Sequence, residues 1–121
     1  MKLLITLLSI VSLQVMAVED TEPTYRYPSE LSDAEHRYMI LSRGKYDECL
    51  KKEAKVNLDK YEDFRKVADV AMETCKTTLA EIDANLTKMN LDPNFRRFFL
   101  RKASQKSAQK LLPELMALKS K

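Results

Sequence analysis

The chain holds two cysteines, Cys49 and Cys75, and they limit the folds that it can adopt. No Gly or Pro lies within residues 45–92, so the residue pattern alone would permit one long helix there. In such a helix the two cysteines would stand about 39 Å apart at 1.5 Å per residue, whereas a disulfide needs Cα atoms within about 7 Å. A disulfide therefore requires the chain to reverse between them. The alternative is two free or intermolecularly bonded thiols.

The N-terminus resembles a secretory signal peptide. Lys2 gives a positive start, residues 3–15 form an apolar run, and residues 15–17 supply the small side chains of a cleavage site. The apolar run is shorter than the roughly 20 residues that a membrane-spanning helix needs. We therefore expect cleavage after Ala17, a secreted, extracellular protein, and a disulfide between the two cysteines in that oxidising environment.

The best candidate for the reversal is the segment 56–59, Val-Asn-Leu-Asp. Asp59 can cap a new helix, and Glu62 three residues later completes a capping-box pattern. A disulfide across this turn would close a loop of about 27 residues and contribute roughly 3 to 4 kcal/mol in the chain-entropy model.

An amphipathic pattern continues from the turn over residues 61–89. Apolar residues recur at intervals of seven, which is typical of a helix with one buried face: Tyr61, Ala68, Cys75, Ile82 and Met89. A break at residues 77–78 is an alternative, because Thr78 and Glu81 form another capping box.

The composition favours helices throughout, since the chain has one Gly and is rich in Lys, Glu, Leu, Ala and Met. We predict an all-α fold, a small bundle of four to five helices with one disulfide. Residues 1–17 are the signal peptide, 18–30 an extended acidic lead-in and 31–121 a single helical domain. The expected helices cover residues 32–43, 46–56, 61–89 and 93–112, with Gly44 ending the first and Pro113 ending or kinking the last.

Charge is distributed unevenly along the chain. Residues 18–95 hold 12 basic and 17 acidic residues, a net of −5, whereas residues 96–121 hold 8 basic and 1 acidic, a net of +7. The two parts either neutralise each other in the folded protein or leave a cationic face for an anionic membrane or acidic partner. That face would consist of Arg97, Arg101, Lys102, Lys106 and Lys110.

No pattern of catalytic residues stands out. His36 is the sole histidine, and no Ser, Asp or Cys partner can be assigned to it. If both cysteines are oxidised, no thiolate remains for catalysis or for a metal site. We expect a non-enzymatic protein with no metal, no cofactor and no nucleic-acid partner, since no nucleic-acid-binding motif accompanies the basic residues.

Part of the chain resembles the N-terminal half of insect odorant-binding proteins. The resemblance lies in residues 49–53, 56–64 and 71–75. Cys49 and Cys75 match the first and third cysteines of that family, which are paired. Ala71 stands in place of the second, and the three later cysteines have no counterpart. The resemblance implies a small helical carrier that encloses a lipid, odorant or pheromone.

The residues themselves permit an apolar pocket, because methionine and aromatic side chains make adaptable walls. The candidates are Tyr61, Phe64, Met72, Leu79, Phe95, Phe98 and Phe99. The alternative is that these side chains fill the core.

We therefore expect a secreted binding protein, monomeric or dimeric, that carries small apolar ligands. One alternative is a venom or salivary effector, a toxin whose cationic last helix engages a membrane, channel or host protein. Another is a structural or seminal-fluid interaction protein.

One modification site is also predicted. Asn85, followed by Leu86 and Thr87, forms a sequon for N-glycosylation. Its position inside an expected helix argues against modification, because Leu86 beside it should be buried.

Overall fold

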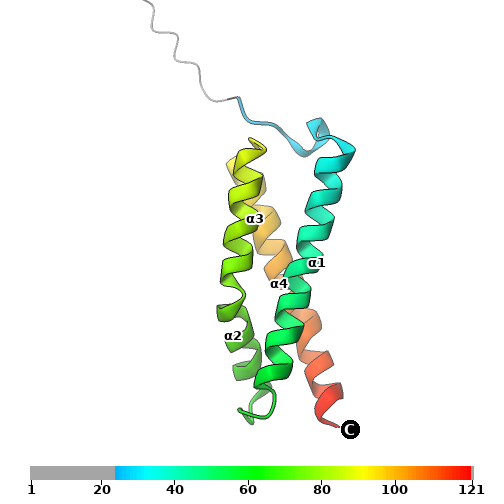
Figure 1. Cartoon of the computed structure of the whole chain (residues 1–121), viewed down its shortest axis with the longest axis vertical. Coiled ribbons are helices and arrows are strands. Elements are labelled where there is room, and N and C mark those ends of the chain that lie inside the picture. Colours follow the sequence, from blue (N-terminus) through cyan, green and yellow to red (C-terminus); the bar gives the residue numbers. More distant parts are fainter. Residues whose placement is uncertain (1–23, 121) are drawn as a thin grey trace, which may run out of the picture.

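The structure, a computed structural model, describes residues 24–120, which form a helical bundle. Its elements are a 3-10 helix η1 (Pro28–Glu30) and four α-helices, α1 (Asp33–Asn57), α2 (Phe64–Thr74), α3 (Lys76–Lys88) and α4 (Pro93–Lys119). α1 and α4 each run the length of the bundle, and α2 and α3 follow one another along its third side (Figure 1). This confirms the predicted all-α class. The predicted signal peptide lies outside the described residues.

A buried stripe explains why α1 is one helix of 25 residues. Its core positions recur every three or four residues: Met39, Ser42, Tyr46, Leu50, Ala54 and Asn57. The predicted helix end at Gly44 is therefore wrong, because the stripe continues past it. Glycine in a helix interior costs about 1 kcal/mol relative to alanine. Burying Tyr46 and Leu50, both 0% exposed, offsets this with roughly 1.5 to 3 kcal/mol each.

The chain reverses between α1 and α2, close to the predicted position. The loop covers residues 58–63 and contains Tyr61, which we had expected in a helix. The predicted cap is wrong: Asp63, not Asp59, caps α2, and its carboxylate accepts a hydrogen bond of 2.9 Å from the backbone N–H of Arg65.

The disulfide between Cys49 and Cys75 is confirmed, with Cα atoms 6.1 Å apart. It joins the middle of α1 to the junction of α2 and α3. Cys75 is fully buried and has ψ 3°, outside the helical range, so the helix breaks there. The single helix expected over residues 61–89 is thus two helices, and the break falls before residues 77–78.

α4 begins as predicted and ends later. Asp92 caps it by accepting a hydrogen bond of 3.0 Å from the Phe95 N–H. The helix then passes through Pro113 to Lys119, so the predicted end at Leu112 is wrong. Leu111 and Leu115 are almost fully buried on either side of Pro113, and their packing holds this last segment of α4 on the bundle.

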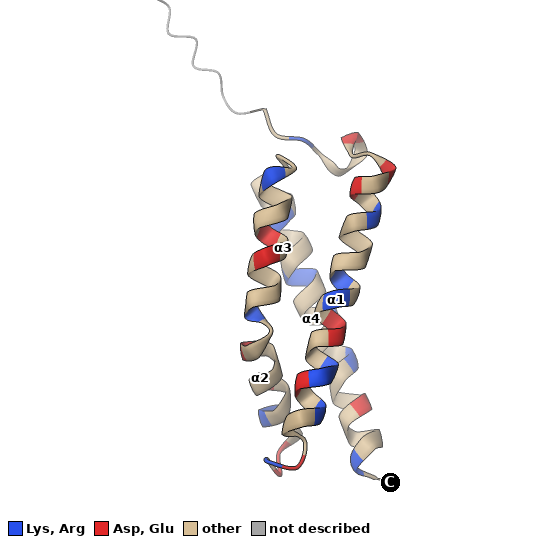
Figure 2. Ribbon diagram, viewed as in Figure 1, with Lys and Arg blue, Asp and Glu red and all other residues tan. Residues whose placement is uncertain are grey.

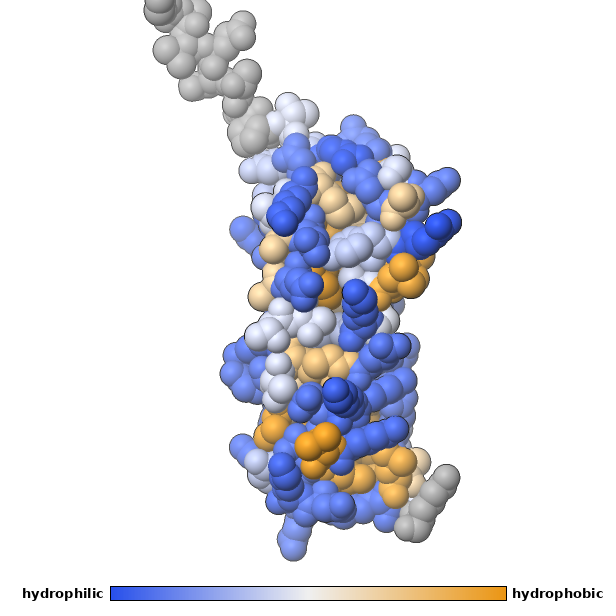
Figure 3. All heavy atoms as spheres, viewed as in Figure 1, coloured by the Kyte–Doolittle hydropathy of each residue, from blue (hydrophilic) through white to orange (hydrophobic). Residues whose placement is uncertain are grey.

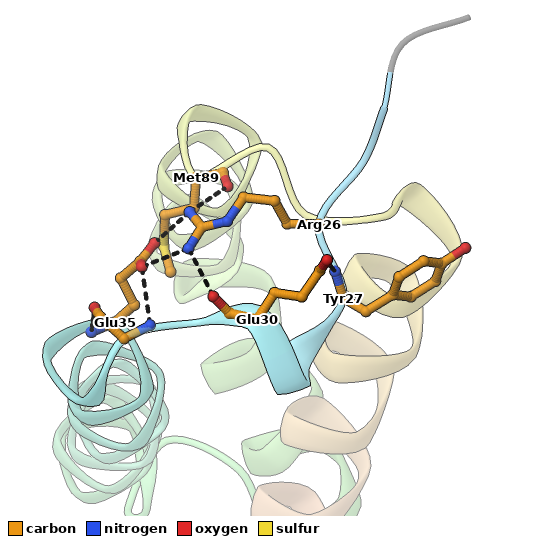
Figure 4. Close-up of polar contacts among 6 residues, drawn as sticks. Arg26, Tyr27, Glu30, Glu35 and Met89 are labelled. Carbon is orange, nitrogen blue, oxygen red and sulfur yellow. Dashed lines mark hydrogen bonds and ion pairs between the residues drawn. The ribbon is translucent and has the colours of Figure 1, made fainter.

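The lead-in is attached to the bundle through Arg26 (Figure 4). Its guanidinium donates two hydrogen bonds of 2.8 Å to the Glu35 carboxylate at the start of α1. It also donates to the backbone carbonyls of Glu30 and Met89, at 3.1 and 3.3 Å. The Arg26 backbone N–H donates to the carbonyl of Asn90 at 2.8 Å. Although the sequence places residues 18–30 outside the helical domain, residues 24–30 are bonded to it.

Candidate ligand-binding surfaces

An apolar groove lies between α1 and the C-terminal part of α4, and we call it the α1–α4 groove. Its volume is about 370 Å³. Most of its surface is apolar, supplied by Leu111, Leu115, Ala117 and Leu118 of α4. Lys51, Lys55 and Glu114 complete the lining. This groove combines an apolar floor with charged groups at its rim.

Of the two rim lysines, one is held by acidic neighbours. The Lys51 ammonium lies 3.2 Å from the carboxylate of Asp47 and 3.6 Å from that of Glu114. The hydrogen bond that Lys51 donates to Asp47, together with the charges of both carboxylates, raises the pKa of Lys51 above its usual value of 10.5. Lys55 is exposed and forms no ion pair within residues 24–120. The groove therefore retains one cation, Lys55, that has no ion-pair partner among the described residues.

Exposed apolar side chains extend the hydrophobic surface at this end of the molecule. Met116 is 58% exposed and Val56 is 56% exposed. Figure 3 shows hydrophobic atoms next to the C-terminal end of the chain on the face that it draws. An apolar ligand in the groove would thus find further apolar surface beside it.

The structure does not bring the seven predicted pocket residues together. Tyr61 and Phe64 lie at the α1–α2 end of the bundle, whereas Phe95, Phe98 and Phe99 lie at the opposite end, where α4 begins (Figure 1). Met72 and Leu79 line a separate depression beside Tyr46 and Ser104. Six of the seven are half-buried and pack against the core, and Phe98 is exposed. The α1–α4 groove contains none of them.

The five predicted cations of α4 are all exposed, and none forms an ion pair within the described residues. Basic positions recur along α4 in Figure 2. Lys106 and Lys110 line a cleft next to α1, and the Lys102 ammonium lies 5.7 Å from the centre of the Phe98 ring. Arg96, which the prediction left out, pairs with Asp83 of α3 at 3.1 Å. Most of the α4 charge therefore remains unneutralised within the described chain.

Asn85 belongs to α3, and its side chain contacts α1. Its side-chain nitrogen, the atom that would carry a glycan, donates a 2.8 Å hydrogen bond to the Tyr38 hydroxyl. Asn85 is half-buried and Leu86 is fully buried. Glycosylation would displace this contact, and it stays a prediction.

Two further properties concern the described residues as a whole. Within residues 24–120, no three His, Cys, Asp or Glu side chains are grouped to hold a metal ion. None of the helices there combines the length and the apolar character needed to cross a membrane.

Comparison of the chain with protein families, characterised proteins and solved structures gave no match. The resemblance to odorant-binding proteins stays a prediction.

Proposed function

We propose that this chain is a secreted, non-enzymatic binding protein that carries small apolar ligands in the α1–α4 groove. The observation that carries the proposal is the groove itself. Its volume of about 370 Å³ falls within the roughly 300 to 1,000 Å³ typical of small-molecule sites. Its floor of leucine side chains favours apolar ligands, because each Å² of apolar surface removed from water contributes about 25 cal/mol.

The rim favours ligands with an anionic end. Lys55 is exposed at the edge of the apolar floor and has no internal partner among the described residues. A ligand with an apolar body and a carboxylate could place the apolar body on the floor of the groove and the carboxylate at Lys55. Extended apolar molecules with one acidic group are therefore the preferred ligand class.

Binding of a neutral fluorescent probe, N-phenyl-1-naphthylamine, tests the proposal. Leu118 lines the groove, and Leu118→Gln should weaken probe binding by about tenfold through loss of one apolar contact. Leu41→Gln is the matched control, because Leu41 is an exposed leucine on α1 that does not line the groove. Equal affinity of both variants and the parent protein would contradict a carrier site here.

A second candidate is an effector whose cationic last helix engages a membrane, channel or host protein. It is favoured by the exposed cations of α4 that form no ion pair with any residue in the range 24–120. Leakage of anionic liposomes without probe binding would support the effector, and probe binding without leakage would support the carrier.

A further inference from the structure

A second cleft lies between the middle of α1 and α4, and we call it the Gly44 cleft. Its volume is about 260 Å³. α1 contributes Ile40, Arg43 and Gly44 to it, and α4 contributes Lys106, Ser107 and Lys110. It is lined by different residues from the α1–α4 groove, so an inference about it is independent of the carrier function.

Nothing in the fold requires a glycine at position 44. Its φ is not positive, and apart from the local backbone a methyl group there would meet no atom within 4 Å. Alanine in a helix interior would raise the ratio of folded to unfolded protein by about fivefold. The missing side chain instead leaves the helix backbone uncovered at the cleft. This points to a ligand that approaches the backbone closely.

The cleft carries a strong positive charge. Arg43, Lys106 and Lys110 form no ion pair within residues 24–120. The one carboxylate in the lining, Asp47, is already paired with Lys51 at 3.2 Å. Lys106 and Lys110 stand one helical turn apart, where like charges repel each other. An anion between them would relieve that repulsion.

A hydroxyl group adds a directional donor. Ser107 is only 8% exposed yet lines the cleft, and its hydroxyl can both donate and accept a hydrogen bond. A guanidinium, two ammonium groups and a hydroxyl together suit an anion with several oxygens. Arginine binds phosphate in a bidentate manner, and lysine binds it as a point charge.

We propose that the Gly44 cleft binds a phosphate group. The side chain of Ile40, 72% exposed at the cleft, indicates its source. An apolar side chain beside a phosphate site suits the headgroup of an anionic phospholipid, because Ile40 can then enter the apolar layer below the headgroups. Free phosphate shares the same chemistry, and the experiment separates the two.

The test measures co-sedimentation of the full chain with phosphatidylcholine vesicles that contain phosphatidylglycerol. Gly44→Gln fills the cleft without adding an apolar side chain and should weaken vesicle binding at least tenfold while keeping or raising thermal stability. Lys106→Gln should weaken binding about fivefold. The control is Lys52→Gln, which removes the same charge from an exposed α1 position outside the cleft and should change binding less than twofold.

Equal effects of Lys106→Gln and Lys52→Gln, or an unchanged affinity in Gly44→Gln, would overturn the proposal, since binding would then follow net charge alone. Millimolar inorganic phosphate, compared with chloride at equal ionic strength, identifies the source. Displacement from vesicles by phosphate but not by chloride supports a site that the lipid headgroup occupies, and phosphate binding by a parent protein that does not bind vesicles supports free phosphate as the ligand. Vesicle binding that phosphate does not weaken would overturn the site. Leu118→Gln should leave vesicle binding unchanged, so failure of the carrier groove and failure of this cleft can be told apart.

Discussion

At the scale of single residues, the ion pair between Arg26 and Glu35 makes the stability of the fold depend on pH. The hydrogen bond from Arg26, followed by that from the Ser32 backbone, lowers the pKa of Glu35 from 4.5 to about 2. Because the pKa is lower in the folded state, the carboxylate stabilises the fold fully above pH 4.5. That contribution is lost as pH falls towards 2. Urea unfolding at pH 7, 4.5 and 2.5 should show this decline.

The variant Arg26→Met isolates the effect. Without the guanidinium, the pKa of Glu35 should rise towards 4.5 and stability should decline less below that pH. Glu62→Gln, in the exposed α1–α2 loop, is the control and should keep the parent pH dependence. An NMR titration in which the Glu35 pKa is the same in Arg26→Met and the parent protein would refute this assignment.

Two tyrosines on α1 should respond oppositely to removal of their hydroxyl groups. Tyr46 is fully buried, and its hydroxyl has no hydrogen-bond partner among the described residues. Tyr38 accepts the 2.8 Å hydrogen bond from Asn85. Tyr46→Phe should therefore leave stability unchanged or raise it by about 1 kcal/mol, whereas Tyr38→Phe should lower it by about 1 kcal/mol. Urea unfolding of both variants gives the comparison, and destabilisation by Tyr46→Phe would show that its hydroxyl has a partner.

Sequence patterns predict residues well when their chemistry is local. The disulfide was predicted from two cysteines and an expected signal peptide, and the exposed cations of α4 were predicted from their spacing. The predicted aromatic pocket is not found as one site. Hydrophobicity predicts that a side chain is buried, but it does not predict which other side chains it contacts. Phe64 and Phe98 belong to opposite ends of the bundle, and only the packing of α2 and α4 reveals it.

At the scale of elements, two helix-breaking residues do not end the helices that contain them. Gly44 and Pro113 both lie inside helices because the core positions continue on either side. Cys75, which carries no breaking tendency of its own, marks a real break instead. The sequence thus predicted the reversal after α1 and the starts of α1 and α4, but not the continuation of the helices past Gly44 and Pro113, since propensities of about 1 to 3 kcal/mol compete with similar packing energies.

Replacement of Pro113 tests this competition. Proline in a helix interior removes one backbone hydrogen bond and costs up to about 3 kcal/mol. Pro113 is exposed, so Pro113→Ala should stabilise the protein without disturbing the core. Pro93→Ala is the matched control and should have little effect, because Pro93 occupies the first turn of α4. Equal urea midpoints for the parent and Pro113→Ala would show that Pro113 has no net cost in this helix.

The disulfide links α1 to the α2–α3 junction and should contribute heavily to stability. With a sequence separation of 26 residues, its loss should cost about 3 to 4 kcal/mol. Urea unfolding of the parent protein with and without reducing agent measures this difference. The double variant Cys49→Ala, Cys75→Ala is the control, and reductant should not shift its midpoint.

For the whole molecule, the uneven charge predicts an unusual response to salt. α4 carries seven basic residues and one acidic residue. Its 27 residues span about 40 Å, and the screening length falls from about 30 Å at 0.01 M salt to about 8 Å at 0.15 M. At low salt, these cations therefore repel one another along most of the helix.

Salt also weakens the attractive pairs, so magnitudes decide the outcome. The described chain has five ion-pair contacts, all with partly exposed side chains, and ion pairs in such positions contribute little to stability. Repulsion among the many α4 cations should outweigh them, so Tm measured by circular dichroism should rise between 0.01 and 0.15 M NaCl. The triple variant Lys102→Gln, Lys106→Gln, Lys110→Gln should raise Tm at low salt and reduce its salt dependence. A Tm that falls with added salt would show that the ion pairs, and not the α4 repulsion, dominate the electrostatics of this fold.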